Sequence, residues 1–154
     1  MNVIFDLKDI GIGKRIFLVG NGPSLNDMNL DLLENEYSIA MNRIELLYPK
    51  TKWRPTHYIF TSSNCQDNVW GHKWSKSILN ASNEEKTTPI IWRKFKDAIE
   101  TNGDGKLPQK TIWLDSITEY PCGDDRQFST DAVDRLDKSG TTMNVALQLA
   151  YYMN

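Results

Sequence analysis

The chain has 154 residues, of which 40% are hydrophobic and 25% are charged, values typical of an ordinary soluble domain. Its formal net charge is -2 at pH 7, so it lacks the basic field that draws proteins onto nucleic acids or anionic membranes. We therefore expect one domain, residues 1–154, with no nucleic-acid partner.

The cysteines and the apolar runs indicate a reducing, aqueous compartment. Cys65 and Cys122 are the only cysteines, too few and too far apart for a disulfide framework or a zinc site, so we expect both to be free thiols. The first residues lack the pattern of a signal peptide, and no apolar segment approaches the roughly 20 residues that span a bilayer. We expect a cytoplasmic protein without a membrane span.

The first strand ends in a turn rich in glycine. Residues 1–14 are typical of a lead-in segment packed on the edge of the domain. Residues 16–19 (IFLV) are the large and β-branched apolar residues of a strand buried on both faces. Gly20-Asn21-Gly22-Pro23-Ser24 follows at once, so we expect a turn whose glycines adopt φ values that other residues resist.

This turn has the composition of a phosphate-binding loop. Pro23 sets φ for the first turn of a helix, and Ser24 with Asp27 predicts a capping box, so backbone N–H groups would point outward unpaired. Such groups bind phosphate. The string has no Gly-Lys-Ser/Thr end, and position 25 is Leu, so it is neither a Walker A loop nor a GxGxxG fingerprint. An ordinary strand-to-helix turn remains the alternative.

Two further strands end on polar residues. Residues 30–33 predict a short amphipathic helix, and residues 37–41 predict a strand that ends at Asn42-Arg43. A brief helix around residues 44–47 then precedes a strand over residues 56–60.

That third strand ends at Thr61-Ser62-Ser63-Asn64. In a parallel α/β sheet the carboxyl ends of the strands share one edge, where ligands bind near the switch point. We therefore expect Asn21, Asn42 and the cluster at residues 61–64 to converge.

The second half of the chain continues the alternation. Val69, Trp70, Trp74 and Ile78 recur at roughly helical spacing. The other expected elements are a strand at residues 89–92, a charged segment 93–110 with a flexible turn at 102–105, a strand at 111–114 and a long irregular segment 115–138. The turn lacks the spaced acidic ligands and closing Glu of an EF-hand loop, so we expect no calcium there.

A final helix closes the pattern. Ser139 is the expected N-cap of a helix over residues 143–153. Its inward stripe is Val145, Ala146, Leu149, Tyr152 and Met153. Another strand normally follows such a helix, so we expect a truncated part of a longer protein, with a natural minimal domain as the alternative. An open sheet edge would favour a homo-oligomer.

The alternation of strands and helices predicts an α/β fold, a Rossmann-like three-layer sandwich with a mainly parallel sheet. Four short blocks of the sequence stand in the same order as in two related groups of proteins. They are residues 19–25, residues 41–43, the strand end near Asn64 and residues 139–150. They resemble the bacterial sialyltransferases that use CMP-sialic acid. They also resemble the related Rossmann-type proteins called hydroxymethylpterin pyrophosphokinase-like, often found beside surface-glycan genes.

The resemblance implies that the Gly-Asn-Gly turn and the strand-end asparagines hold a nucleotide, and that the Ser-Gly segment lies beside its phosphate and sugar. The nucleotide- or substrate-binding residues that it implies, directly or as neighbours in these blocks, are Gly20, Asn21, Gly22, Pro23, Ser24, Asn42, Arg43, Ser63, Asn64, Ser139, Gly140 and Thr141.

The sialyltransferases carry their histidine base and phosphate-contacting tyrosines after the strand that follows the Ser-Gly helix, and this chain ends earlier. We therefore name no catalytic residue, expect no sugar transfer from the chain alone, and expect structural or surface roles for His57 and His72.

Three hypotheses follow. The leading one is a nucleotide-sugar-binding domain of a sialyltransferase-like glycosyltransferase with a CMP-sugar donor and no cofactor. The second is pyrophosphoryl transfer from ATP to a pterin alcohol, which needs Mg²⁺ on carboxylates such as Asp115, Asp124 and Asp125. The third is a nucleotide-binding module without catalysis.

Overall fold

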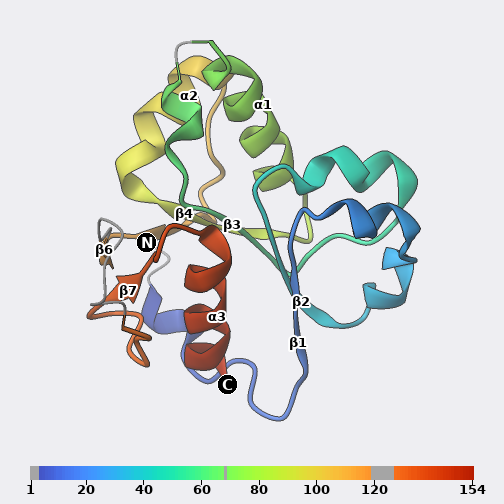
Figure 1. Cartoon of the computed structure of the whole chain (residues 1–154), viewed down its shortest axis with the longest axis vertical. Helices are drawn as coiled ribbons and strands as arrows, with labels where there is room; N and C mark the ends of the chain where they lie inside the picture. Colours follow the sequence, from blue (N-terminus) through green and yellow to red (C-terminus); the bar gives the residue numbers. More distant parts are fainter. Residues whose placement is uncertain (1–3, 68, 119–126) are drawn as a thin grey trace.

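The computed structural model describes residues 4–67, 69–118 and 127–154 and has a five-stranded, all-parallel sheet flanked by helices (Figure 1). The predicted α/β class is confirmed. The strands lie in the order β1-β2-β3-β4-β5. Their bounds are β1 Ile16–Val19, β2 Tyr37–Met41, β3 His57–Phe60, β4 Thr88–Trp92 and β5 Ile112–Leu114. Strands are neighbours in space in the order in which the chain makes them.

One face of the sheet is covered by the connections between consecutive strands, because like-handed crossovers between adjacent parallel strands stack on one side. Its core joins Tyr58 and Phe60 of β3 to Ile78 and Ile99 of the two helices above them. The elements in these connections are η2 Pro23–Asp27, η3 Leu30–Leu33, η4 Ile44–Lys50, η5 Ser63–Gln66, α1 Gly71–Ser82, η6 Arg93–Phe95 and α2 Lys96–Gly103.

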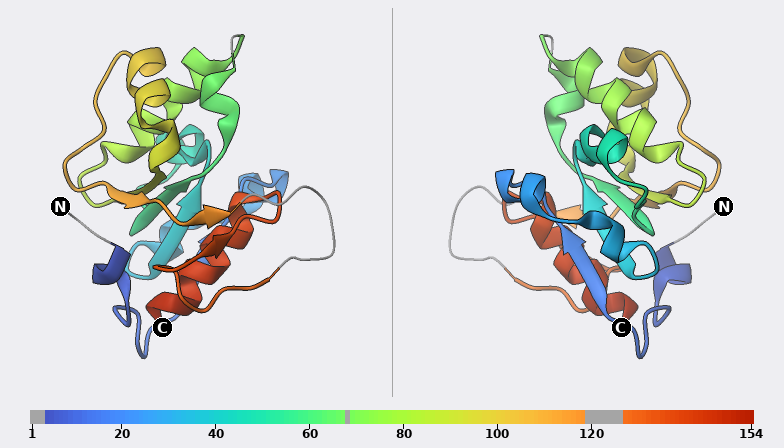
Figure 2. Two further views of the ribbon diagram at one scale, coloured as in Figure 1. Left: turned by 90° about the vertical axis from the view of Figure 1, so that its left-hand side faces the viewer. Right: turned by 90° about the vertical axis from the view of Figure 1, so that its right-hand side faces the viewer.

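The opposite face is covered by α3 (Thr142–Met153) and by η1 (Ile4–Leu7), so the molecule has three layers (Figure 2). Val145 and Leu149 of α3 pack with Ile39 and Ile59 of the sheet, and all four are fully buried. The whole predicted stripe of α3 is buried. Within the five-stranded sheet the strand order never reverses, so the connections between its strands stay on one face. The chain reaches the opposite face with α3, after β5.

Two stretches differ from the sequence prediction. The charged segment after β4 contains α2, whose buried face consists of Ile99 and Gly103. The predicted flexible turn is the end of this helix, since Asp104 is left-handed (φ 53°) and its N–H bonds the carbonyls of Glu100 and Thr101. Most residues of α2 are polar and at least partly exposed, so the sequence shows no clear helical pattern of apolar residues.

The second stretch follows β5. It contains a small parallel pair, β6 (Ile117–Thr118) and β7 (Leu136–Asp137), where an irregular segment was expected. Strands of two residues leave no periodic signal in the sequence. The intervening residues 119–126, with Cys122, Asp124 and Asp125, lie outside the described residues.

We predict that Gly103→Ala destabilises the α1–α2 contact. A methyl group at Gly103 would lie 2.5 Å from Leu79 Cδ1 and 3.1 Å from the backbone of Ser75. Overpacking of this kind costs about 1–3 kcal/mol, measured as a lower free energy of unfolding in urea. Gly22→Ala is the matched control, because its methyl group would meet only Ser24 Oγ, at 3.6 Å. Equal stabilities of the two variants would contradict the prediction.

Candidate functional site at the carboxyl edge of the sheet

The ends of β1, β2 and β3 lie next to one another beneath the start of α3, because these strands are neighbours and parallel. Thr61, just after β3, shares a buried hydrogen bond of 3.0 Å with Thr142 at the first turn of α3. A Cβ at Gly20 would lie 3.1 Å from Met143 Cε. The strand ends predicted to converge are thus gathered around one helix terminus.

Asn21 ties the first two strand ends together. With its amide oriented to satisfy both contacts, it donates to Met41 O at 2.8 Å and accepts from Ile44 N–H at 3.3 Å. Met41 is the last residue of β2 and Ile44 the first of η4, so the side chain spans the turn between them. The Asn21 amide therefore links the end of β1 to the end of β2 at the carboxyl edge of the sheet.

Asn42 lies inside the turn that Asn21 spans, and its backbone is left-handed, with φ 54°. Its N–H donates to Ile59 O at 3.3 Å, and its carbonyl accepts from the hydroxyl of Tyr58 at 2.7 Å. Non-glycine residues in this conformation cluster at functional sites, where the surrounding structure over-determines them. The side-chain oxygen Oδ1 is buried and has no hydrogen-bond partner among the described residues.

Arg43 is held from behind by a buried polar cluster. Its Nε donates to Ser77 Oγ at 3.2 Å, and Ser77 Oγ donates to Glu45 Oε1. The guanidinium also lies 5.7 Å from the centre of the Trp74 ring. Burial raises the pKa of Glu45, although the bond from Ser77 and the charge of Arg43 act in the opposite direction. This cluster joins the end of β2 to α1.

A hollow of about 430 Å³ lies between the Gly-Asn-Gly turn and η4. Four of the predicted site residues line it, and these are Asn21, Gly22, Pro23 and Arg43.

The remaining predicted residues lie along the edge in different roles. Ser24 is exposed within η2, and Ser63 and Asn64 are exposed in η5, where Ser62 is the N-cap. Gly20 is half-buried beside Met143.

The Ser139-Gly140 turn is organised by a buried carboxylate that sequence reasoning missed. Asp137 Oδ1 accepts from the N–H and the hydroxyl of Ser139, at 2.8 and 2.6 Å. Burial alone would raise the pKa of Asp137, but these bonds and the N–H of Gln127 lower it. Both Ser139 (φ 43°) and Gly140 (φ 78°) are left-handed. The donors of Ser139 are therefore already taken by Asp137.

Three local predictions are wrong. The N-cap of α3 is Thr141, which accepts from Met143 N–H, because Ser139 is drawn away by Asp137. Ser24 forms no capping box, since Pro23 occupies the first position of η2 and makes Gly22 the cap. Gly22 has φ -71°, and Gly20 is not left-handed either, so the expected positive φ does not account for these glycines. Only Gly20 is closely packed, since a Cβ there would lie 3.1 Å from Met143 Cε.

Of the three carboxylates that the pyrophosphokinase alternative would use for Mg²⁺, Asp115 is already paired. Asp115, at the end of β5, makes a bidentate pair with Arg93 at the end of β4, with distances of 2.6 and 3.0 Å. In the described part of the chain no group of three His, Cys, Asp or Glu side chains could hold a metal ion.

Both histidines have the structural or surface positions expected of them. His57 begins β3, at the far end from the site, and bonds the Tyr37 hydroxyl at 2.6 Å and Thr88 O at 3.3 Å. Burial lowers its pKa to about 4. His72 is exposed, and its Nδ1 lies 2.6 Å from Asn102 O. Cys65 is a buried free thiol.

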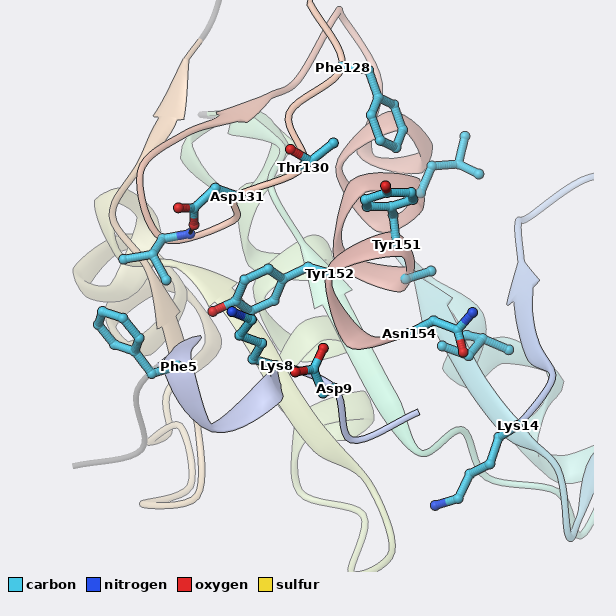
Figure 3. A pocket seen from close by; sticks show the side chains of 14 residues that line it. Phe5, Lys8, Asp9, Lys14, Phe128, Thr130, Asp131, Tyr151, Tyr152 and Asn154 are labelled. Carbon is cyan, nitrogen blue, oxygen red and sulfur yellow. Dashed lines mark hydrogen bonds between the residues drawn. The ribbon is translucent and has the colours of Figure 1, made fainter. Parts of the chain in front are cut away.

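A second, larger hollow of about 900 Å³ lies beside the C-terminal half of α3 (Figure 3). Phe128 and Tyr151 pack edge to face on its rim, with Tyr152, Asp9 and Asp131 nearby. It contains none of the predicted site residues.

No protein-family model, curated protein or solved structure matches this chain. Of the helices within residues 4–67, 69–118 and 127–154, none has the length and apolar character needed to cross a membrane.

We predict that His57 makes the protein less stable in acid. Its folded pKa of about 4 lies below the ordinary value of 6.5, so the unfolded chain binds the proton more tightly. The contribution of His57 is complete above pH 6.5 and is lost as the pH falls toward 4, amounting to about 3 kcal/mol. Urea unfolding across this range measures it. His57→Gln should show a shallower pH dependence, and an identical slope would contradict the assignment.

Proposed function

We propose that the carboxyl edge binds a nucleotide or nucleotide sugar, as the nucleotide-sugar-binding part of a glycosyltransferase of the sialyltransferase-like kind with a CMP-sugar donor. The observation that carries this proposal is Asn42. Its left-handed backbone is held by Tyr58 and Ile59, and its amide oxygen has no hydrogen-bond partner among the described residues, which fits a residue shaped to accept a hydrogen bond from a ligand.

The chemistry of the edge supports a ligand of this class. The Asn42 amide oxygen, which accepts from no described residue, fits the hydroxyl groups of a ribose or the amino group of a cytosine, both of which are donors. The positive end of α3 faces the same strand ends and favours an anionic group there. Parallel α/β sheets bind their ligands outside the carboxyl ends of their strands.

Transfer of a sugar would need a base for the acceptor hydroxyl and a group that neutralises the leaving phosphate. The Arg43 guanidinium, which lines the hollow beside the Gly-Asn-Gly turn, is a cation available for the second requirement. We assign no residue to the first, because His57 lies at the other end of the sheet and His72 is bonded to α2.

The pyrophosphokinase alternative has less support among the described residues. It needs carboxylates free to hold Mg²⁺, and Asp115 is bound on both oxygens by Arg93. Asp124 and Asp125 lie outside the described residues.

Calorimetry with CMP, UDP, GTP and ATP, each with and without Mg²⁺, tests the proposal, and we expect CMP to bind most tightly. Asn42→Gly should weaken CMP binding by about 10-fold or more, the effect of one lost hydrogen bond to a buried group. Glycine adopts φ 54° without strain, so the variant should be no less stable than the parent.

Asn35→Gly, an exposed turn position away from the edge, is the matched control. Unchanged CMP affinity in Asn42→Gly would remove the basis of the proposal. A preference for ATP with Mg²⁺ would favour the pyrophosphokinase class.

A further inference from the structure

The hollow between the Gly-Asn-Gly turn and η4 has the charge of an anion site. Its lining includes the cations Arg43 and Lys50 and contains no acidic residue. All of the lining residues lie in the described part of the chain. Gly22 leaves space on the facing wall, since a Cβ there would meet only Ser24 Oγ, at 3.6 Å. A volume of about 430 Å³ exceeds what a single phosphoryl group needs, so part of a larger ligand could extend from it.

Arg43 is pre-oriented as a donor. Ser77 Oγ accepts from Nε, Glu45 Oε1 lies 4.0 Å from the same Nε, and the guanidinium lies over the Trp74 ring, 5.7 Å from its centre. Neither Nη1 nor Nη2 has a hydrogen bond or ion pair to a described residue. A guanidinium fixed through Nε retains the nitrogens that grip two oxygens of a phosphate, and its conformational entropy has already been lost.

Glu45 limits the positive charge of this site without entering it. Its side chain is 9% exposed, Oε1 accepts from Ser77, and Oε2 is buried with no hydrogen-bond partner among the described residues. The carboxylate therefore orients Arg43 through Ser77 and, by its charge, weakens the attraction of Arg43 for an anion.

We propose that this hollow is the phosphate subsite of the nucleotide site, with Arg43 as the forked donor, Lys50 as a second cation, and Glu45 and Ser77 as positioning residues. This inference rests on the proposed function. The family resemblance would put the phosphate beside Ser139 instead, but both donors of Ser139 already bond Asp137. Within the described ranges, the terminal nitrogens of Arg43 meet no such competitor.

The test compares cytidine, CMP and inorganic pyrophosphate in calorimetry. Arg43→Gln should weaken CMP and pyrophosphate binding by about 10- to 100-fold, as expected for hydrogen bonds to a charged group, and leave cytidine binding unchanged. Lys50→Gln should weaken the binding of both anions about threefold, the effect of losing one solvent-exposed ion pair. Lys52→Gln is the matched control, because Lys52 lies outside the hollow, and it should leave both affinities unchanged.

Glu45→Gln keeps the bond to Ser77 and removes the opposing charge, so it should tighten CMP binding by about fivefold. Gly22→Val should block CMP and pyrophosphate sterically, because its side chain would fill space on the wall that faces Arg43. Valine adopts φ -71° readily and a Cβ there meets only Ser24 Oγ, at 3.6 Å, so we expect the fold to be retained. Ser139→Ala should leave CMP affinity unchanged. Urea unfolding of each variant separates these effects from loss of structure, and the Arg43→Gln/Glu45→Gln double variant avoids a buried unpaired charge.

The outcomes separate the two proposals. If CMP binds but Arg43→Gln and Gly22→Val do not weaken it, or Ser139→Ala does, the phosphate lies elsewhere and the subsite is wrong. If neither CMP nor cytidine binds, the proposed function is wrong, and Arg43-dependent binding of pyrophosphate would then show that the hollow still selects phosphate. Absence of that binding as well would overturn both.

Discussion

The left-handed backbone of Asn42 is the constraint on which the carboxyl edge depends. Tyr58 and Ile59 of the neighbouring strand hold its carbonyl and N–H, and the Asn21 amide spans the residues on either side. With the chain fixed at this point, the amide oxygen of Asn42 is buried and meets no hydrogen-bond partner in the part of the chain that the structure describes. The next residue, Arg43, is directed to α1. One strained residue thereby connects three strand ends and a helix.

Much of the fold is predictable because the strands are apolar runs that stop on small polar residues. The prediction that residues 16–19 are buried on both faces is wrong, since β1 lies at the edge of the sheet and only Val19 of its residues is buried. The run at residues 16–19 and its counterparts needed no tertiary information, and parallel pairing then placed their ends together. The inward stripe of α3 was equally clear. The strand order without reversal was not, because crossover connections of similar length permit several orders.

The misses concern side chains whose hydrogen-bond partners are set by the folded structure, whether two residues away, as for Ser139, or 34 residues away, as for Arg43. Ser139 has the composition of an N-cap, but Asp137 captures its donors. Arg43 was identified from its position after a strand, yet the role proposed for it depends on Ser77, 34 residues away, and on Glu45. No local pattern reveals such a cluster. Helix α2 was not predicted either, because only Ile99 and Gly103 of its residues are buried and so short an apolar face leaves no clear periodic signal.

The central claim is that the ligand site is the carboxyl edge of the sheet. The alternative is the second, larger hollow beside the C-terminal half of α3. Amide chemical shifts of the labelled protein during a titration with CMP test it most directly. We expect saturable changes confined to residues 20–24, 42–50 and the start of α3, with none at Phe128, Tyr151 or His57. Changes centred on Phe128 and Tyr151, or no saturable change at all, would contradict the account.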